Sequence, residues 1–290
     1  MIGFVRALAL CAVCSAAAAQ PDPRWYFQHD NDVVFFTDRW FTSALRVARV
    51  AFHGEHEVEL ALHQDIFTPE AKTFELGRSD RAPDARLHFA VARHDRIPGR
   101  HVTWEAALGV RGPAALGEET TDAIHRIIAA REVDWSRQQR NRLEAQLTYA
   151  RSDRFQRLRV HHGVVAGTTL AFAHAGVEWR IGDQQVADLA SPVLRFAPTP
   201  PWDAGGRRGW SSFVGASWRY VARNRFIRAP YDPFAPDLLR RERGVARFAA
   251  GITWLDRWGS LVFAVAQESH EFHSQRTPHR FGSLTVHVPF

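Results

Sequence analysis

Apolar and polar residues alternate with a period of two along much of this chain. In one stretch Val58, Leu60 and Leu62 occupy one face, while Glu57 and Glu59 occupy the other. The same alternation returns in residues 143–150 and 283–290. Such alternation predicts β-strands with one apolar face. Candidate strands lie at 24–31, 41–52, 57–67, 85–94, 102–112, 141–151, 156–167, 169–182, 210–222, 243–255, 259–271 and 280–290.

The count is about twelve, an even number within the range of membrane barrels. Alternation alone fits a soluble sandwich as well as a membrane barrel, because it does not tell whether the apolar face points inward to a core or outward to lipid. The last predicted strand ends the chain on Phe290. That ending is similar to the signal that the barrel-assembly machinery of outer membranes reads. We therefore expect an all-β fold, a transmembrane antiparallel β-barrel of about 12 strands whose apolar face meets lipid.

One segment departs from the β pattern. Residues 117–130 predict a helix, with Glu118 and Glu119 in the first turn, where the helix dipole favours anions. Ile124 and Ile127 share one side of it, and Thr121 and His125 share another. We expect this short helix in an extracellular loop of the barrel.

The first residues predict a secretory signal peptide at 1–19. Arg6 precedes a short apolar run, and Ala17 and Ala19 form the pattern that signal peptidase reads. The run is too short to span a bilayer, and both cysteines, Cys11 and Cys14, lie within it or just after it. We expect residues 20–290 to form one barrel domain in the outer membrane of a Gram-negative bacterium.

Composition supports a membrane barrel. The mean hydropathy is −0.28, yet the chain has 10 Trp and 20 Phe, as expected for a polar lumen with aromatic girdles. No later segment is apolar for long enough to be a membrane helix. The net charge of +6 comes almost wholly from arginine, and Lys72 is the only lysine. Arginine suits phosphate recognition and a GC-rich genome equally well, and nothing points to a nucleic-acid partner.

Four blocks in order give the chain a specific resemblance. They are the run from His29 to Thr42; residues 64–69 with Lys72 and Arg81; residues 109–113 followed by the helix with His125; and residues 219–224 followed far downstream by residues 281–284. Together they resemble the LpxR-type lipid A deacylases, outer-membrane barrels that remove acyl chains from the 3′ side of lipid A. The resemblance covers essentially the whole mature chain.

The resemblance implies a calcium-dependent ester hydrolysis acting on lipid A or lipopolysaccharide. On this chain it makes His125 the general base. It adds Asn31, Asp32, Thr42 and Lys72 as active-site positions, Asn31 and Asp32 as ligands of Ca²⁺, and Thr121 and Arg81 as substrate-binding positions. The chemistry is coherent, because a neutral histidine accepts a proton from water near neutral pH and calcium prefers carboxylate and carbonyl oxygens.

The same residues have simpler explanations. A histidine on a surface helix is more often a solvated side chain, and an Asn-Asp pair often only makes a turn. Thr42 is an ordinary strand residue, and Lys72 is by default a solvated charge. The sequence also departs from the family: Thr121 stands where the family has glutamine, Ser43-Ala44 follows Thr42, and Gly167-Thr168 replaces a Gly-Asn pair.

Two other functions remain open. One is a catalytically silent barrel, structural or a narrow pore. The other is a barrel phospholipase or esterase, which would be expected to carry a serine nucleophile paired with a histidine in one strand. No Ser-His arrangement along the sequence is placed convincingly for that chemistry.

Overall fold

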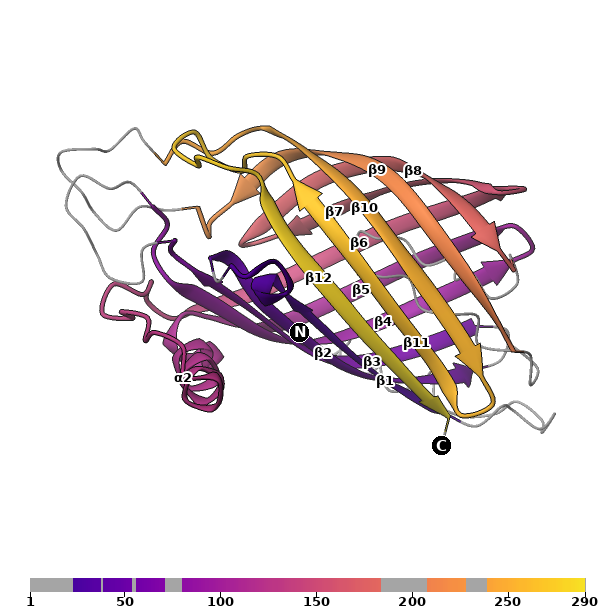
Figure 1. Ribbon diagram of the computed structural model, residues 1–290, viewed down its shortest axis with the longest axis horizontal. Helices are drawn as coiled ribbons and strands as arrows, with labels where there is room; N and C mark the ends of the chain where they lie inside the picture. The colour runs from indigo at the N-terminus through magenta and orange to yellow at the C-terminus, as the bar shows by residue number, and fades with distance from the viewer. Residues whose placement is uncertain are drawn as a thin grey trace, which may run out of the picture.

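A computed structural model confirms the predicted barrel. It describes residues 23–37, 39–53, 56–70, 80–183, 208–227 and 239–289. Twelve strands close into one barrel (Figure 1). They are β1 (Arg24–Asn31), β2 (Trp40–His53), β3 (His56–Thr68), β4 (Asp84–Ile97), β5 (Arg100–Arg111), β6 (Arg142–Phe155), β7 (Leu158–Gly167), β8 (Leu170–Gly182), β9 (Gly209–Asn224), β10 (Gly244–Asp256), β11 (Gly259–Glu268) and β12 (His279–Pro289). Each strand begins close to its predicted position.

Neighbours in sequence are neighbours in the wall, and all pairs are antiparallel. The barrel closes between β1 and β12, where Arg24 lies opposite Pro289 and Asn31 lies opposite Gly282. Closure pairs the strand edges that lipid could not hydrogen-bond. The signal peptide predicted at 1–19 lies outside the described residues.

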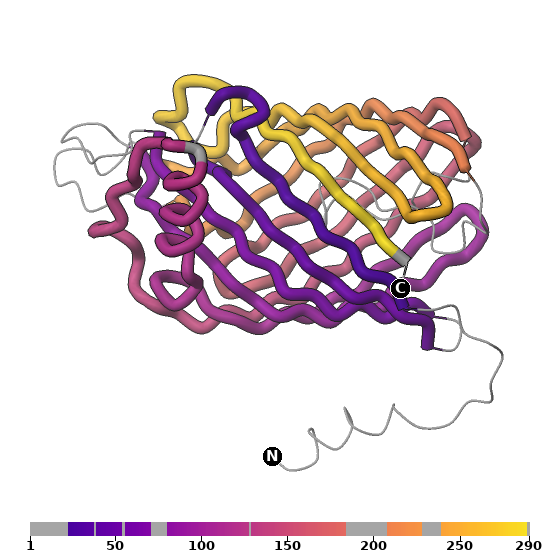
Figure 2. Tube along the Cα trace, turned by 60° about the horizontal axis from the view of Figure 1, so that its bottom comes forward, coloured from indigo at the N-terminus to yellow at the C-terminus, as the bar shows by residue number. Residues whose placement is uncertain are grey.

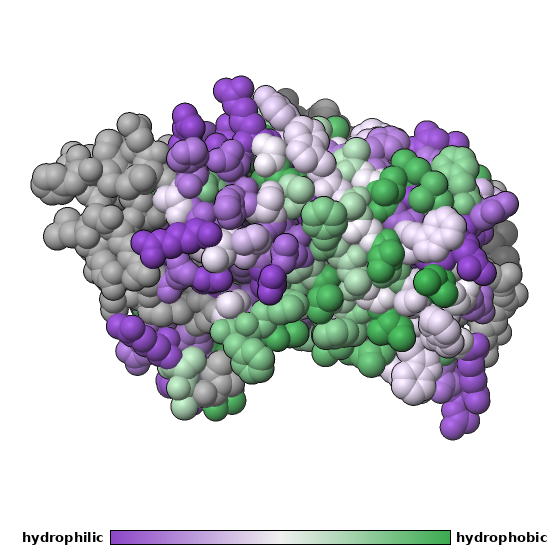
Figure 3. All heavy atoms as spheres, turned by 45° about the horizontal axis from the view of Figure 1, so that its top comes forward, coloured by the Kyte–Doolittle hydropathy of each residue, from purple (hydrophilic) through white to green (hydrophobic). Residues whose placement is uncertain are grey.

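The outer surface carries an apolar belt, visible as the green region between purple ends in Figure 3. Strand positions that point outward hold large exposed side chains such as Leu62, Leu108 and Val214. Six tryptophans mark one end of this belt and all are exposed: Trp25, Trp104, Trp179, Trp210, Trp254 and Trp258. Such a ring is the aromatic girdle expected at a membrane interface, so the outward apolar face meets lipid.

Charged side chains that point into the lumen are paired with one another. Arg46 contacts Glu59 at 2.5 Å and Glu105 at 2.7 Å, and all three are buried. Similar clusters surround Arg86 and Arg180. Because an unpaired charge in a narrow lumen is costly, this pairing explains why a barrel interior can hold so many arginines.

The two ends of the barrel differ. At the tryptophan end, short turns join β2 to β3, β4 to β5, β6 to β7 and β10 to β11, and residues 183–208 make the one long connection at this end, from β8 to β9. Most connections at the other end are longer, and they include the only α-helix among the described residues. Short turns face the periplasm in barrels of this kind, so the longer loops face outward from the cell. Within the described residues, no helix is long and apolar enough to cross a membrane.

The predicted helix is confirmed as α2 (Gly117–Ile128), preceded by η3 (Pro113–Ala115). It lies alongside the outer wall near the loop end (Figure 2). Gln64, which points outward from β3, donates from Nε2 to the carbonyl oxygens of Ala115 at 2.7 Å and Leu116 at 3.2 Å. A Cβ at Gly117 would lie 2.4 Å from the Ala85 Cβ, so this glycine lets the helix start directly on β4.

The buried face of α2 is polar. Thr121 and His125 are buried, whereas Ile127 is 84% exposed and Ile124 is half-buried. In a water-soluble protein this helix would turn its isoleucines inward. Here the opposite orientation leaves Ile127 on the outside of a barrel whose exterior is already apolar, and it keeps Thr121 and His125 buried.

The hydrogen bonds from Gln64 to the chain at the start of α2 lead to a testable prediction. We expect Gln64→Leu to leave the barrel closed but to loosen the helix, because two carbonyl oxygens at its start lose their donor, worth about 1 kcal/mol each. Hydrogen exchange of residues 117–128 in detergent should become faster. Gln267→Leu, a matched change on the outer face of β11, should leave exchange in α2 unchanged, and equal exchange in both variants would contradict the docking role of Gln64.

Candidate active site on the outer wall

The end of β1 places Asn31 and Asp32 on the outer side of the wall. The strand stops at Asn31, and the short turn η2 (Asp32–Phe35) follows. Asn31 caps this turn, since its Oδ1 accepts from the Val33 N–H at 2.6 Å. Asp32 is fully buried, and its Oδ2 accepts from the Thr37 hydroxyl at 2.9 Å and from the Arg39 N–H at 2.7 Å. The turn thus holds a buried carboxylate in a fixed position.

Thr42 sits in an irregularity of the β2–β3 pairing. Phe41 pairs with Phe67 and Ser43 pairs with Ile66, so Thr42 is the extra residue of a β-bulge. Its hydroxyl lies 2.5 Å from the Thr68 hydroxyl. A bulge redirects a side chain that the regular pleat would have placed elsewhere, and bulges recur beside active sites. Asn31 pairs with Ser43, so Asn31 and Thr42 are close neighbours across β1 and β2.

The end of α2 fixes the imidazole of His125. Ala129 adopts the left-handed conformation (φ 51°), and the Ala130 N–H donates to the His125 carbonyl oxygen. This tight reversal brings the Arg131 carbonyl oxygen to 2.7 Å from His125 Nδ1. A carbonyl oxygen only accepts, so Nδ1 carries the hydrogen and the neutral ring has its lone pair on Nε2. That is the tautomer a general base requires.

Thr121 lies one helical turn before His125 on the same buried face of α2. It is 3% exposed, and its hydroxyl has no hydrogen-bond partner within the described part of the chain. Buried hydroxyls are nearly always paired. The Thr121 hydroxyl is therefore left with a hydrogen bond to make to a water or a bound molecule.

Strand β3 links the two halves of the candidate site. Gln64, Ile66 and Thr68 follow one another on its outward positions: Gln64 holds the start of α2, and Thr68 contacts Thr42. Asn31, Asp32, Thr42, Thr121 and His125 thus all belong to the outer side of the same wall, near its loop end. That the His125 ring comes within reach of a substrate bound at Asp32 stays a prediction.

Two predicted positions do not join this group. Lys72 lies outside the described residues. Arg81 is 1% exposed, its guanidinium lies 4.4 Å over the Phe67 ring, and it is 3.6 Å from Glu271. Burial lowers the pKa of Arg81, and burial together with the nearby Glu268 raises the pKa of Glu271. Arg81 therefore belongs to the lumen side of the barrel, where Phe67 points, and not to the outer wall.

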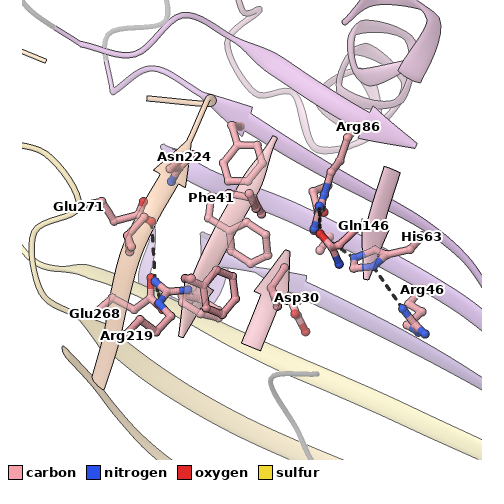
Figure 4. A pocket seen from close by; sticks show the side chains of 18 of the residues that line it. Asp30, Phe41, Arg46, His63, Arg86, Gln146, Arg219, Asn224, Glu268 and Glu271 are labelled. Atoms are coloured by element: carbon pink, nitrogen blue, oxygen red, sulfur yellow. Dashed lines mark hydrogen bonds and ion pairs between the residues drawn. The ribbon is translucent and has the colours of Figure 1, made fainter. Parts of the chain in front are cut away.

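The lumen contains a cavity near the loop end, about 170 Å³ in volume. Figure 4 shows Arg219 beside Glu268 and Glu271 at this cavity, and Arg86 beside Gln146. The Phe41 and Phe67 rings pack against each other at a tilt of 50°, and both line the cavity. None of the outer-wall residues of the candidate site lines this cavity, so the cavity and the predicted chemistry lie on opposite sides of the wall.

The side-chain oxygen atoms at η2 are of the types that calcium prefers as ligands. Asp32 offers a carboxylate and Asn31 an amide carbonyl, and both sit where the turn constrains them. Within the described ranges, no group of three or more His, Cys, Asp or Glu side chains surrounds a position for a metal ion. An ion held here would take its remaining ligands from backbone carbonyls, water or the substrate.

The structure adds a Ser–His contact that lies between two strands and not within one. A serine and a histidine do meet on the outer wall: His29 Nε2 lies 3.1 Å from Ser43 Oγ, with His29 half-buried and Ser43 buried. The two residues are fourteen positions apart and come from β1 and β2. Only the register of this strand pair could have revealed the contact, because the irregular turn η2 separates them in sequence.

Comparisons with known proteins agree with this architecture. The sequence matches the family described as outer membrane protein LpxR over residues 4–290. The solved structure of LpxR from Salmonella typhimurium superposes with a TM-score of 0.78 at 17% identity, covering 92% of this chain and 100% of that one. The β domain of the Bordetella autotransporter BrkA matches at 8% identity with a TM-score of 0.47, covering 93% of this chain and 99% of that one. A search of curated proteins found no match. A closed barrel of twelve strands, a wall-docked helix and a family match across nearly the whole sequence lead to one conclusion: this chain belongs to the outer membrane protein LpxR family.

Proposed function

We propose that this protein is a lipid A deacylase, a hydrolase that removes the 3′-linked acyl or acyloxyacyl chain of lipid A in the outer leaflet. The observation that carries the proposal is His125, buried on α2 at the outer side of the barrel with Nδ1 bonded to the Arg131 carbonyl oxygen. A histidine fixed as a base on the lipid-facing side of a barrel has no role in a pore. It is suited to an ester whose acyl chains lie in the surrounding leaflet.

In the proposed reaction, His125 Nε2 takes a proton from water as the water attacks the ester carbonyl carbon. The bond to Arg131 keeps the ring in one orientation during this transfer. His125 then returns the proton to the sugar oxygen that leaves. Thr121 offers a hydroxyl to the substrate from the same helix face.

Asn31 and Asp32 would hold a calcium ion, which when bound supplies positive charge to stabilise the developing oxyanion. Asp32 already has its position fixed by Thr37 and Arg39, so the carboxylate is preorganised before substrate arrives. Thr42 lies beside Asn31 on the neighbouring strand, and its hydroxyl contacts that of Thr68. Lys72 remains a proposed partner for the oxyanion from the resemblance alone.

The His29–Ser43 contact supports a second candidate, a serine esterase acting on phospholipid or lipid A. Ser43 would attack the carbonyl while His29 takes its proton. The geometry of that pair favours this candidate, but Ser43 is only 6% exposed and no described carboxylate orients His29 by a hydrogen bond. We therefore rank it below the His125 mechanism.

The first test of the proposal is removal of the base. We expect His125→Ala to reduce lipid A deacylation at least 100-fold, since general-base catalysis contributes about 10²–10⁴-fold, while heat-modifiable barrel mobility on gels is retained. Mass spectrometry of lipid A from expressing cells measures the product. Asp32→Ala should be equally inactive, and a chelator should inhibit the wild-type protein reversibly.

Each outcome of this test is decisive. High calcium should partly restore Asp32→Asn, because an amide oxygen is still a weak ligand. Full activity in chelator would exclude a role for the metal in the reaction and make Lys72 the leading oxyanion partner. Full activity of His125→Ala in a folded barrel would end the proposal.

A second test concerns Thr121. We expect the isosteric change Thr121→Val to lower kcat/KM about 5-fold, which corresponds to the loss of one hydrogen bond of about 1 kcal/mol, while barrel stability is unchanged or improved. Thr121→Gln, which introduces the residue usual in the family, should keep or raise activity. Equal activity in all three proteins would show that the Thr121 hydroxyl does not touch the substrate.

A third test separates the two candidate mechanisms. Under the His125 mechanism we expect Ser43→Ala to retain activity within about 3-fold, because removal of the hydroxyl costs only the hydrogen bond to His29. A fluorophosphonate probe should then leave the wild-type protein unlabelled. Covalent labelling at Ser43, together with an inactive Ser43→Ala protein, would establish the serine esterase instead.

A further inference from the structure

The turn η2 presents apolar side chains on the side opposite to its buried carboxylate. Val33 is 50% exposed, Val34 is 45% exposed and Phe36 is 98% exposed. Phe36 adopts the left-handed conformation (φ 57°), which is unfavourable for an aromatic residue without a compensating gain. Asp32, at the start of the same turn, is fully buried.

This turn lies against the outside of the wall. A Cβ added at Gly282 would lie 2.8 Å from Val34 Cγ2, so Val34 packs directly on the glycine. Gly282 points outward from β12, between the inward-facing Phe281 and Ser283, and Leu284 continues the same outward face. Figure 1 shows η2, in indigo, in front of the wall and not over the opening of the barrel. Its apolar side is therefore continuous with the lipid-facing belt.

The length of β1 gives the position of η2 along the membrane normal. Asn31 is six residues after Trp25, which belongs to the aromatic girdle at the turn end. Six residues of strand rise about 20 Å, and a tilt of about 40° reduces this to about 15 Å along the membrane normal. The apolar band of such barrels is about 25 Å tall. β1 therefore ends inside the band, and η2 begins within the hydrocarbon of the outer leaflet.

We propose that η2 is a lipid-embedded wedge, in which Val33, Val34 and Phe36 contact the acyl chains of the lipid whose ester lies at Asp32. The turn would then have two roles: its inner side carries the Asp32 carboxylate, and its outer side contacts the acyl chains of the lipid. The lipid contact rests on the fold alone; its link to Asp32 rests on the proposed function. Exposing these three side chains to water instead would forgo the free energy gained when apolar surface leaves water.

The lipid contact is tested without any activity. Both cysteines of the chain lie in the predicted signal peptide, so Phe36→Cys in the processed protein offers one thiol for a fluorophore. In vesicles of phosphatidylcholine we expect strong quenching by nitroxide-labelled phospholipid and little quenching by an aqueous nickel chelate. Val214→Cys, on the outer belt, should behave in the same way, and Glu132→Cys, exposed in the loop after α2, should show the reverse. Quenching at position 36 that matches Glu132→Cys would overturn the proposal.

The substrate contact is tested by activity on bilayers that contain lipid A. We expect Phe36→Asp to raise KM at least 10-fold with little change in kcat, and Phe36→Leu to remain close to wild type, because leucine keeps the apolar contact. Wild-type kinetics in Phe36→Asp would overturn the acyl-chain role. A wild-type protein without any deacylase activity would refute the proposed function, while the quenching result would still decide where η2 lies.

Discussion

A barrel in lipid must pair every backbone N–H and C=O of its wall internally, and the rest of this structure follows from that constraint. The strand ladder meets it by closing β1 on β12. The wall departs from the regular ladder at only a few described positions, and two of them adjoin the candidate site. At η2 the chain leaves the ladder and satisfies its polar groups with Asn31 and Asp32, and at Thr42 one extra residue bulges out of β2. Irregular backbone is thus concentrated where side chains have to be aimed.

The two faces of the wall have separate physical tasks. Inside, arginines and carboxylates neutralise one another, as Arg46 does with Glu59 and Glu105. Outside, the belt is apolar except for a small group of polar residues, which includes His29, Asn31 and the buried face of α2. A polar group on a lipid-facing surface is costly unless it is paired or covered. The helix and η2 provide this cover.

The sequence predicted the strands and the helix well because their signals are periodic and repeated: a shift of one residue would exchange the lipid and lumen faces of a whole strand. It could not predict the bulge at Thr42, since one extra residue leaves no mark on composition. Arg81 shows a different limit. It lies close to Lys72 in sequence, but sequence proximity does not say on which side of a wall a side chain points, and the contact with Phe67 assigns Arg81 to the lumen. The His29–Ser43 pair was missed for a related reason, as it depends on the register across an irregular turn.

Helix α2 docks on the outside of the wall, and this changes how a substrate would arrive. A site on that surface meets molecules that diffuse sideways within one leaflet, so encounter takes place in two dimensions and depends on the lateral density of the lipid and not on its concentration in water. Neighbouring lipids and neighbouring proteins compete for the same stretch of perimeter. Crowding of the membrane around β2, β3 and β4 would therefore reduce the rate at which lipid reaches the site, although the protein itself is unchanged.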